Sequence, residues 1–293
     1  MPVLETVVYS IVIVWFMPAI VMRTDCWIRC MATTVLDSVP EDLIKYEENE
    51  ENDIVLNDSI ERITIVLQEI EYGLLVISAP AGTGKSTYLM KALQKMTTKR
   101  RMKIFTGGTY LQDFKKILSS FGMPDHAKLS TYLPKKSIVI IDQVDFTGAA
   151  FNETIQANIT DLATDSHNSK KYLVILCVSD AKFAKKVLLC NGGEKINLVV
   201  PPVKLKWTKC DAEKFISLKM ISMKMIPEDE MMQPLLEDFA PCYNPHIMRD
   251  YFKRKGWTKD AIKSRTKLKE ERWDEFATHM DCDFINRYLV PIP

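Results

Sequence analysis

The 293-residue chain carries 39 basic and 38 acidic side chains, so its formal net charge is +1. Hydrophobic residues make up 47% of the chain and charged residues 26%, as in a globular protein with a substantial core. This composition excludes a chain that is disordered throughout, a protein with many membrane spans and a uniformly basic nucleic-acid-binding protein. The length allows one large domain or two small ones.

The seven cysteines and four histidines are scattered along the sequence. The cysteine count is odd and no Cys-X-X-Cys pair occurs, which argues against a disulfide framework and against a zinc finger. Reduced cysteines in a cytosolic domain fit this pattern better.

The first thirty residues differ from the rest of the chain. Residues 7–22 (VVYSIVIVWFMPAIVM) carry no charge, and the apolar stretch reaches back to residue 3 with Glu5 as its one charged side chain. A membrane-spanning helix needs about 20 apolar residues, so residues 3–22 are a candidate membrane anchor. Arg23 and Arg29 follow the stretch, which favours a cytosolic C-terminal part. A buried or partner-binding helix, or an extension foreign to the functional protein, are the alternatives.

The near-zero net charge is the sum of unlike segments. From Asp37 to Glu71 there are twelve acids and two bases, whereas from Asp250 to Arg272 there are nine bases and four acids. The acidic run Glu47–Asp53 is typical of a solvated linker. The basic run between residues 253 and 272, which contains Trp257 and is followed by Trp273, is a candidate nucleic-acid surface, with a solvated helix face as the simpler alternative.

The clearest motif is a glycine-rich loop. The apolar run Leu74–Ser78 is typical of a buried parallel strand, and it leads directly into residues 79–86 (APAGTGKS) and then into a stretch with apolar residues at helical spacing. A strand, a loop ending in Gly-Lys-Ser and a helix form the context of a phosphate-binding loop. Ala79 stands where the strict pattern has glycine, which is a mild departure.

Each residue type in this loop fits the binding of ATP with Mg²⁺. Gly82 and Gly84 let backbone amides turn toward phosphate oxygens without a clashing Cβ atom, at a helix N-terminus that favours an anion. Lys85 brings a positive charge to the β- and γ-phosphates, and the Ser86 hydroxyl is a Mg²⁺ ligand. The predicted nucleotide-binding residues are Ala79, Pro80, Ala81, Gly82, Thr83, Gly84, Lys85, Ser86 and Thr87.

A second motif supplies the matching carboxylate. Residues 137–142 (SIVIID) contain four β-branched residues before Asp142, so Asp142 is expected at the carboxyl edge of the sheet, beside the loop. A strand-terminal aspartate in that place holds Mg²⁺. Ser86 and Asp142 are therefore the predicted metal ligands.

Residues 138–146 (IVIIDQVDF) resemble the Walker B segment of AAA+ and related STAND-type ATPases, in which a second acidic residue follows the strand. Gln143 stands at that position here. The family's carboxylate polarises the attacking water, whereas glutamine orients water but cannot accept its proton. Two interpretations stay open: Asp145 or another carboxylate takes over this role, or the protein hydrolyses ATP slowly.

The resemblance assigns further roles. In these families an apolar strand such as residues 172–178 lies between the other two and presents a polar sensor near the γ-phosphate, which makes Ser179 the candidate and Asp180 the second choice. Tyr243–Arg249 (YNPHIMR) resembles the GNP-x-x-x-R turn of a helical lid, with Tyr243 at the glycine position, which implies that Arg249 reaches the γ-phosphate when the lid closes.

No arginine for activating a neighbouring subunit is evident near the end of the fourth helix of the core, where Lys182, Lys185 and Lys186 lie instead. Lysine lacks the planar fork of arginine. Arg100 and Arg101 are the remaining candidates for that role.

Strands and helices alternate between residues 57 and 202. Strands are expected at residues 74–78, 103–106, 137–142, 172–178 and 196–200, with helices between them. This alternation predicts an α/β fold, a five-stranded parallel P-loop NTPase sheet with helices on both faces, and ligands at the carboxyl ends of the strands. A small helical lid follows at residues 203–257. The other predicted parts are a hydrophobic segment (1–30), an acidic linker (31–56) and a basic C-terminal segment (258–293).

The sequence thus predicts an AAA+/STAND-like ATPase that couples ATP binding and slow hydrolysis to lid movement on a nucleic-acid or protein partner, or within a homo-oligomer. A membrane-tethered ATP-binding switch with little turnover, a viral-type superfamily 3 helicase and a P-loop kinase are the alternatives. The predicted catalytic residues are Lys85, Asp142, Gln143, Asp145, Ser179 and Arg249.

Overall fold

The computed structural model describes residues 58–96, 100–145, 151–190, 196–199, 207–240, 243–253 and 259–280. The predicted membrane anchor (3–22) and the acidic linker (31–56) lie outside these ranges. Among the helices of the described ranges, none combines the length and the hydrophobicity that crossing a bilayer requires.

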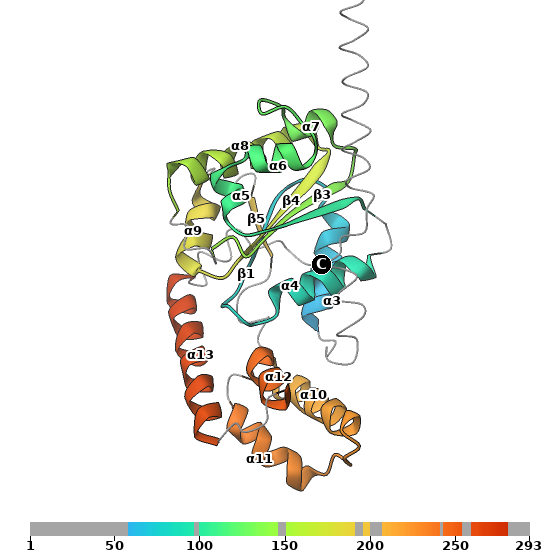
Figure 1. Ribbon diagram of the computed structural model, residues 1–293, viewed down its shortest axis with the longest axis vertical. Coiled ribbons are helices and arrows are strands. Elements are labelled where there is room, and N and C mark those ends of the chain that lie inside the picture. The colour runs from blue at the N-terminus through green and yellow to red at the C-terminus, as the bar shows by residue number, and fades with distance from the viewer. Residues whose placement is uncertain are drawn as a thin grey trace, which may run out of the picture.

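A parallel sheet forms the centre of the fold (Figure 1). Its spatial order is β2-β3-β4-β1-β5. β4 therefore lies between the strand that precedes the phosphate loop and the strand that ends at Asp142, as the resemblance implied. The strand bounds are β1 (Gly73–Ser78), β2 (Met102–Thr106), β3 (Ser137–Asp142), β4 (Tyr172–Val178) and β5 (Ile196–Val199), and every pairing is parallel.

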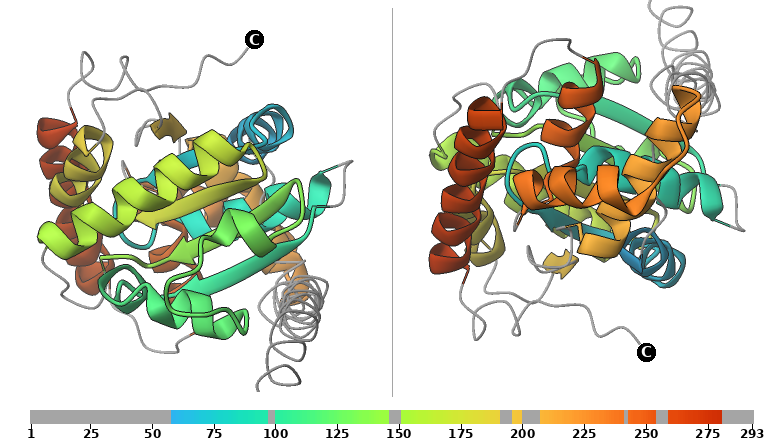
Figure 2. Two further views of the ribbon diagram at one scale, coloured as in Figure 1. Left: turned by 90° about the horizontal axis from the view of Figure 1, so that it is seen from above. Right: turned by 90° about the horizontal axis from the view of Figure 1, so that it is seen from below.

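Helices cover both faces of this sheet, which confirms the predicted α/β architecture (Figure 2). β1, β3 and β4 are buried along their whole length, because alternate side chains enter two different cores. Leu75 and Ile77 face α3 (Asp58–Glu69) and α4 (Lys85–Lys95), whereas Leu74 and Val76 face the opposite layer. That layer contains α5 (Thr109–Gln112), α6 (Lys115–Ser120), α7 (Leu129–Tyr132), α8 (Glu153–Ser169) and α9 (Ala181–Leu189).

Three helices follow the sheet in the region predicted as a lid: α10 (Lys209–Ser222), α11 (Asp229–Phe239) and α12 (Pro245–Lys253). A capping box at Thr208 and Asp211 starts α10. The apolar side chains of these helices join the core that covers the α3–α4 face of the sheet. The lid is therefore continuous with that face.

The last described helix, α13 (Lys259–His279), returns from the lid to the sheet (Figure 1). Ile262 near its start is buried in the lid-side core. Phe276 and Met280 at its end are buried in the opposite core, beside α9. The basic charge of this segment gave no indication that it connects the lid to the sheet.

Arg100 is a structural residue, which makes its proposed role toward a neighbouring subunit wrong. Its guanidinium is buried and donates to the carbonyl oxygens of Leu67, Ile70, Glu71 and Lys136 at 2.9–3.2 Å. Burial lowers the pKa of Arg100 to about 10, so the side chain stays charged at neutral pH. It thereby joins the end of α3 to the start of β3.

Replacing Arg100 by Met should destabilise the fold by about 3 kcal/mol, because four carbonyl groups lose a charged donor in a buried place. Urea unfolding measures this change in the free energy of unfolding. The exposed neighbour Arg101 is the matched control, and Arg101→Met should cost about 0.5 kcal/mol or less. Equal losses in the two variants would contradict the structural role of Arg100.

Candidate nucleotide-binding site

The loop between β1 and α4 has the backbone of a phosphate cradle. Gly82 and Gly84 adopt φ values of 80° and 92°, a left-handed conformation that favours glycine. A Cβ atom on Gly84 would lie 3.2 Å from Cε2 of Tyr88, so the loop also lacks space for a side chain there. The Thr83 hydroxyl donates to the Pro80 carbonyl at 2.9 Å and closes the loop on itself.

Lys85 is the first residue of α4, and its ammonium lies at the centre of the site. The side chain is only 7% exposed. Its Nζ atom donates to the carbonyl oxygens of Ala79 (2.7 Å) and Pro80 (3.2 Å) and to Oγ of Ser179 (2.8 Å). The predicted phosphate-loop lysine and the predicted sensor thus meet across two adjacent strands.

Asp142 ends β3 as a buried carboxylate near the loop. Its Oδ1 atom accepts the backbone N–H of Gln143 at 2.9 Å, and the Cys177 thiol on β4 lies within its electrostatic reach. Burial raises the pKa of Cys177 well above its ordinary value, and the negative charge of Asp142 raises it further. Cys177 is therefore a neutral thiol beside the carboxylate.

Gln143 and Asp145 follow at the same edge of the sheet. The Gln143 side chain is exposed, and its backbone has the left-handed φ of 53°. Asp145 turns toward β4, where its Oδ2 accepts the backbone N–H groups of Ser179, at 2.8 Å, and of Asp180. Its Oδ1 is buried, with no hydrogen-bond partner among the described residues. Asp145 therefore fixes the segment that presents Ser179 to Lys85.

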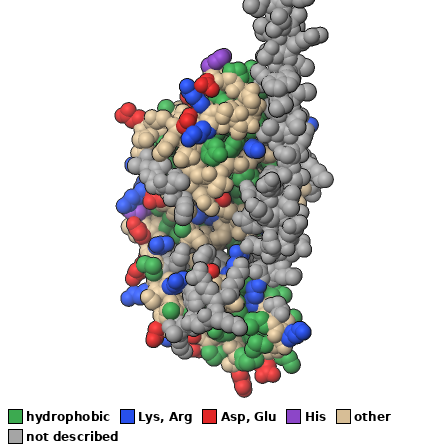
Figure 3. Space-filling view, viewed as in Figure 1, with side chains coloured by type: hydrophobic (Ala, Val, Ile, Leu, Met, Phe, Trp, Pro, Cys, Tyr) green, Lys and Arg blue, Asp and Glu red, His purple; other side chains and the backbone are tan. Residues whose placement is uncertain are grey.

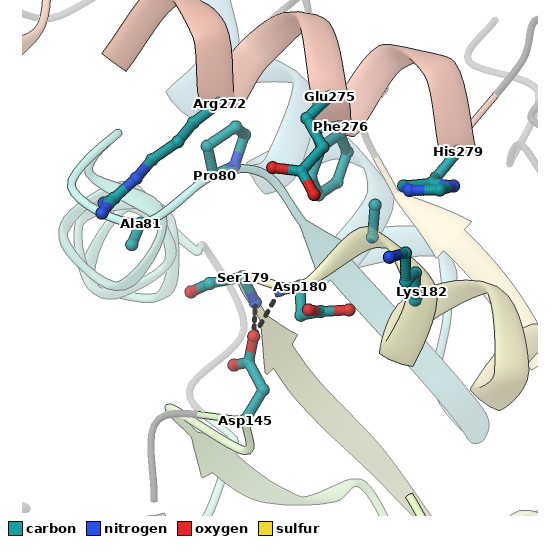
Figure 4. A pocket seen from close by; sticks show the side chains of 11 residues that line it. Pro80, Ala81, Asp145, Ser179, Asp180, Lys182, Arg272, Glu275, Phe276 and His279 are labelled. Carbon is teal, nitrogen blue, oxygen red and sulfur yellow. Dashed lines mark hydrogen bonds between the residues drawn. The ribbon is translucent and has the colours of Figure 1, made fainter. Parts of the chain in front are cut away.

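A pocket of about 350 Å³ opens beside this cluster (Figure 4). The phosphate loop lines one side of the pocket, the start of α9 lines a second side, and α13 lines a third side. Only the basic charge of residues 253–272 hinted at the contribution of α13. The lining residues are Pro80, Ala81, Asp145, Ser179, Asp180, Ala181, Lys182, Arg272, Glu275, Phe276 and His279.

No family model and no curated protein sequence matches this chain. Among solved structures, a Walker-type ATPase of Pyrococcus abyssi is similar over 83% of this chain and 79% of its own, with a TM-score of 0.50 and 14% identity. The chain therefore has the α/β fold of this Walker-type ATPase. Two replication initiation proteins, DnaA domain III of Thermotoga maritima and AMPPCP-bound DnaA of Aquifex aeolicus, are more distant. Their TM-scores are 0.43 and 0.45, at 14% and 12% identity, over 77% and 74% of this chain and 98% and 68% of theirs.

The remaining predicted residues of this P-loop site lie in two places. Ser86 and Thr87 are half-buried in the first turn of α4, next to Lys85. Arg249 is half-buried on α12, and the residues that line the pocket do not include it. Its role as a second phosphate sensor stays a prediction. Tyr243 adopts a left-handed backbone conformation with φ 39°, which favours glycine. Glycine is the residue that the GNP-x-x-x-R pattern has at this position.

Replacing Gly84 by Ala should destabilise the fold by about 1–2 kcal/mol through the left-handed backbone, and by more through the contact with Tyr88. Gly122 is a matched control, because its φ of 67° carries the same penalty in an exposed turn. Differential scanning calorimetry should show a lower Tm for Gly84→Ala than for Gly122→Ala. The reverse order would mean that the loop relaxes around the methyl group.

Proposed function

We propose that the chain binds ATP with Mg²⁺ in the phosphate loop and hydrolyses it slowly, and that the bound nucleotide controls the lid. The observation that carries this proposal is the placement of Lys85, whose ammonium joins the loop carbonyls to Ser179 at the end of β4. A cation held at the N-terminus of α4 is suited to the terminal phosphates.

The residues present fit ATP and Mg²⁺. Gly82 and Gly84 have the left-handed backbone that favours glycine, and in a phosphate-binding loop such glycines let backbone amides turn toward phosphate oxygens. Mg²⁺ keeps several waters and needs only one or two protein ligands, which Ser86 and Asp142 supply. The orphaned Oδ1 of Asp145 adds a buried acceptor at the same edge. When bound, Mg²⁺ would neutralise charge on the phosphates.

Slow turnover follows from the two groups that remain for activating water. Gln143 is exposed and can orient a water molecule, but its amide cannot take the proton. Asp145 already uses Oδ2 to hold two backbone amides. We infer that Asp145 positions Ser179 and that the site lacks an efficient general base. The same observation favours the second candidate function, an ATP-binding switch with little turnover.

The lid contacts α4, the helix that follows the phosphate loop, through aromatic side chains. Tyr88, one turn beyond Gly84, accepts a hydrogen bond from the Trp207 indole, and Trp207 packs edge-on against Phe215 of α10 at 5.3 Å. A change in the loop therefore reaches the lid through packed groups.

The lid tip suits a protein partner. Hydrophobic side chains gather where α10 meets α11 (Figure 3), and Ile221, Met223 and Ile226 are more than half exposed. Exposed apolar patches of this kind mark interaction sites. Stimulation of ATP hydrolysis by DNA or RNA would instead favour a nucleic-acid partner through residues 253–272.

Replacing Lys85 by Ala should weaken ATP binding roughly 100-fold, because the phosphates lose a charged hydrogen-bond donor. Isothermal titration calorimetry of the full chain with MgATP measures the affinity. Lys95→Ala, in the exposed last turn of the same helix, is the matched control and should bind as the unchanged chain does. Unchanged affinity in Lys85→Ala would refute nucleotide binding at this loop.

Replacing Gln143 by Glu should raise the rate of ATP hydrolysis about 100-fold, because a carboxylate can accept the proton that the amide cannot. The rate of phosphate release at saturating MgATP measures this, and Gln143→Ala serves as the control without a polar group. If the Glu variant were no faster than the unchanged chain, the missing carboxylate would not be what limits turnover.

A further inference from the structure

The phosphate pocket contains an arginine that the proposed function has not used. Arg272 lies on α13, far from the loop in sequence, yet it lines the same pocket as Pro80 and Ala81. Its side chain extends from the helix toward Ala81 (Figure 4). The guanidinium is exposed and makes no ion pair with any described residue, so its donors are available to a ligand.

This pocket adjoins the place where a terminal phosphate would lie. The Nζ atom of Lys85 points from the loop to Ser179, and Ser179 itself lines the pocket. A phosphate held by the loop amides and by Lys85 therefore has the pocket next to it. Ala81, toward which Arg272 points, belongs to the first half of the loop.

The described acidic side chains that line the pocket form no ion pair with Arg272. Asp180 caps α9 by accepting the backbone N–H of Phe183 at 2.7 Å. Asp145 accepts two backbone amides. Glu275 also lines the pocket, and Lys182 lies on the opposite side, at the start of α9 (Figure 4).

Packing of α13 holds Arg272 in this place. Phe276, one turn after Arg272, is only 3% exposed and belongs to the core that includes α9. At the other end of the helix, Ile262 is buried in the core that includes the lid. The same helix therefore touches the phosphate pocket with one end and the lid with the other.

We propose that Arg272 binds the terminal phosphate of ATP, as an arginine supplied by the chain itself, and so makes α13 sensitive to the difference between ATP and ADP. A planar guanidinium forms paired, charge-assisted hydrogen bonds to phosphate oxygens. This inference rests on the proposed function, because it needs nucleotide in the loop. It gives the chain a phosphate-binding arginine without a second subunit.

The test compares the affinities of the full chain for a non-hydrolysable ATP analogue and for ADP, both with Mg²⁺, by isothermal titration calorimetry. Arg272→Ala should weaken binding of the ATP analogue about 10-fold or more and leave ADP binding within about twofold. Arg272→Lys should recover part of the loss, because it restores the charge without the fork. Lys267→Ala, an exposed cation on the same helix outside the pocket, should leave both affinities unchanged.

Each outcome separates this inference from the proposed function. If the unchanged chain binds both nucleotides and Arg272→Ala keeps the same ratio of affinities, the role of Arg272 is refuted while the nucleotide site stands. Equal weakening of both nucleotides would also refute it, since that pattern indicates a structural effect. If Lys85→Ala binds the ATP analogue as the unchanged chain does, both proposals fall. Thermal unfolding of Arg272→Ala should give an unchanged Tm, because the side chain is exposed.

Discussion

The rest of the site depends on the hydrogen-bond acceptors that surround the buried ammonium of Lys85. A charged group out of water is costly unless it is fully hydrogen-bonded. Here two partners come from the loop after β1 and the third is Ser179, at the end of β4. The third partner exists only because β4 pairs directly with β1. The strand order therefore decides whether the lysine is held at the centre of the loop.

Side chains next to the loop belong to both hydrophobic cores of the molecule. On one side, Tyr88 of α4 bonds Trp207, which begins the lid. On the other side, Phe276 anchors α13 against the layer that contains α9. The lid-side core and the opposite core are separated by the sheet, and α13 connects them around its edge. A ligand in the loop thus lies next to two separate contacts with the helical part of the chain, one through Tyr88 and Trp207 and one through α13.

The sequence was informative wherever the signal was local. Continuous apolar runs predicted β1, β3 and β4, because strands buried on both faces need apolar side chains at every position. The glycine-rich loop after β1 was equally predictable from the sequence. Arg100 was not, because its partners are carbonyl groups from α3 and β3 that only the fold brings together. The return of α13 was hidden for the same reason: of its two anchors, Ile262 is a single apolar residue in the basic stretch and Phe276 lies just beyond it.

Gln143 stands where the resembling ATPases have a carboxylate. In the proposed function, this one difference affects ATP hydrolysis without affecting ATP binding. At Gln143 the left-handed backbone places the residue's N–H on Oδ1 of Asp142, and that contact is independent of the side chain. The loop amides, Lys85 and Asp142 therefore keep their arrangement whether residue 143 is Gln or Glu. Only the chemistry of water activation needs the carboxylate. Under the proposed function, Gln in place of a carboxylate at this turn would lower the rate of hydrolysis and leave ATP binding in place.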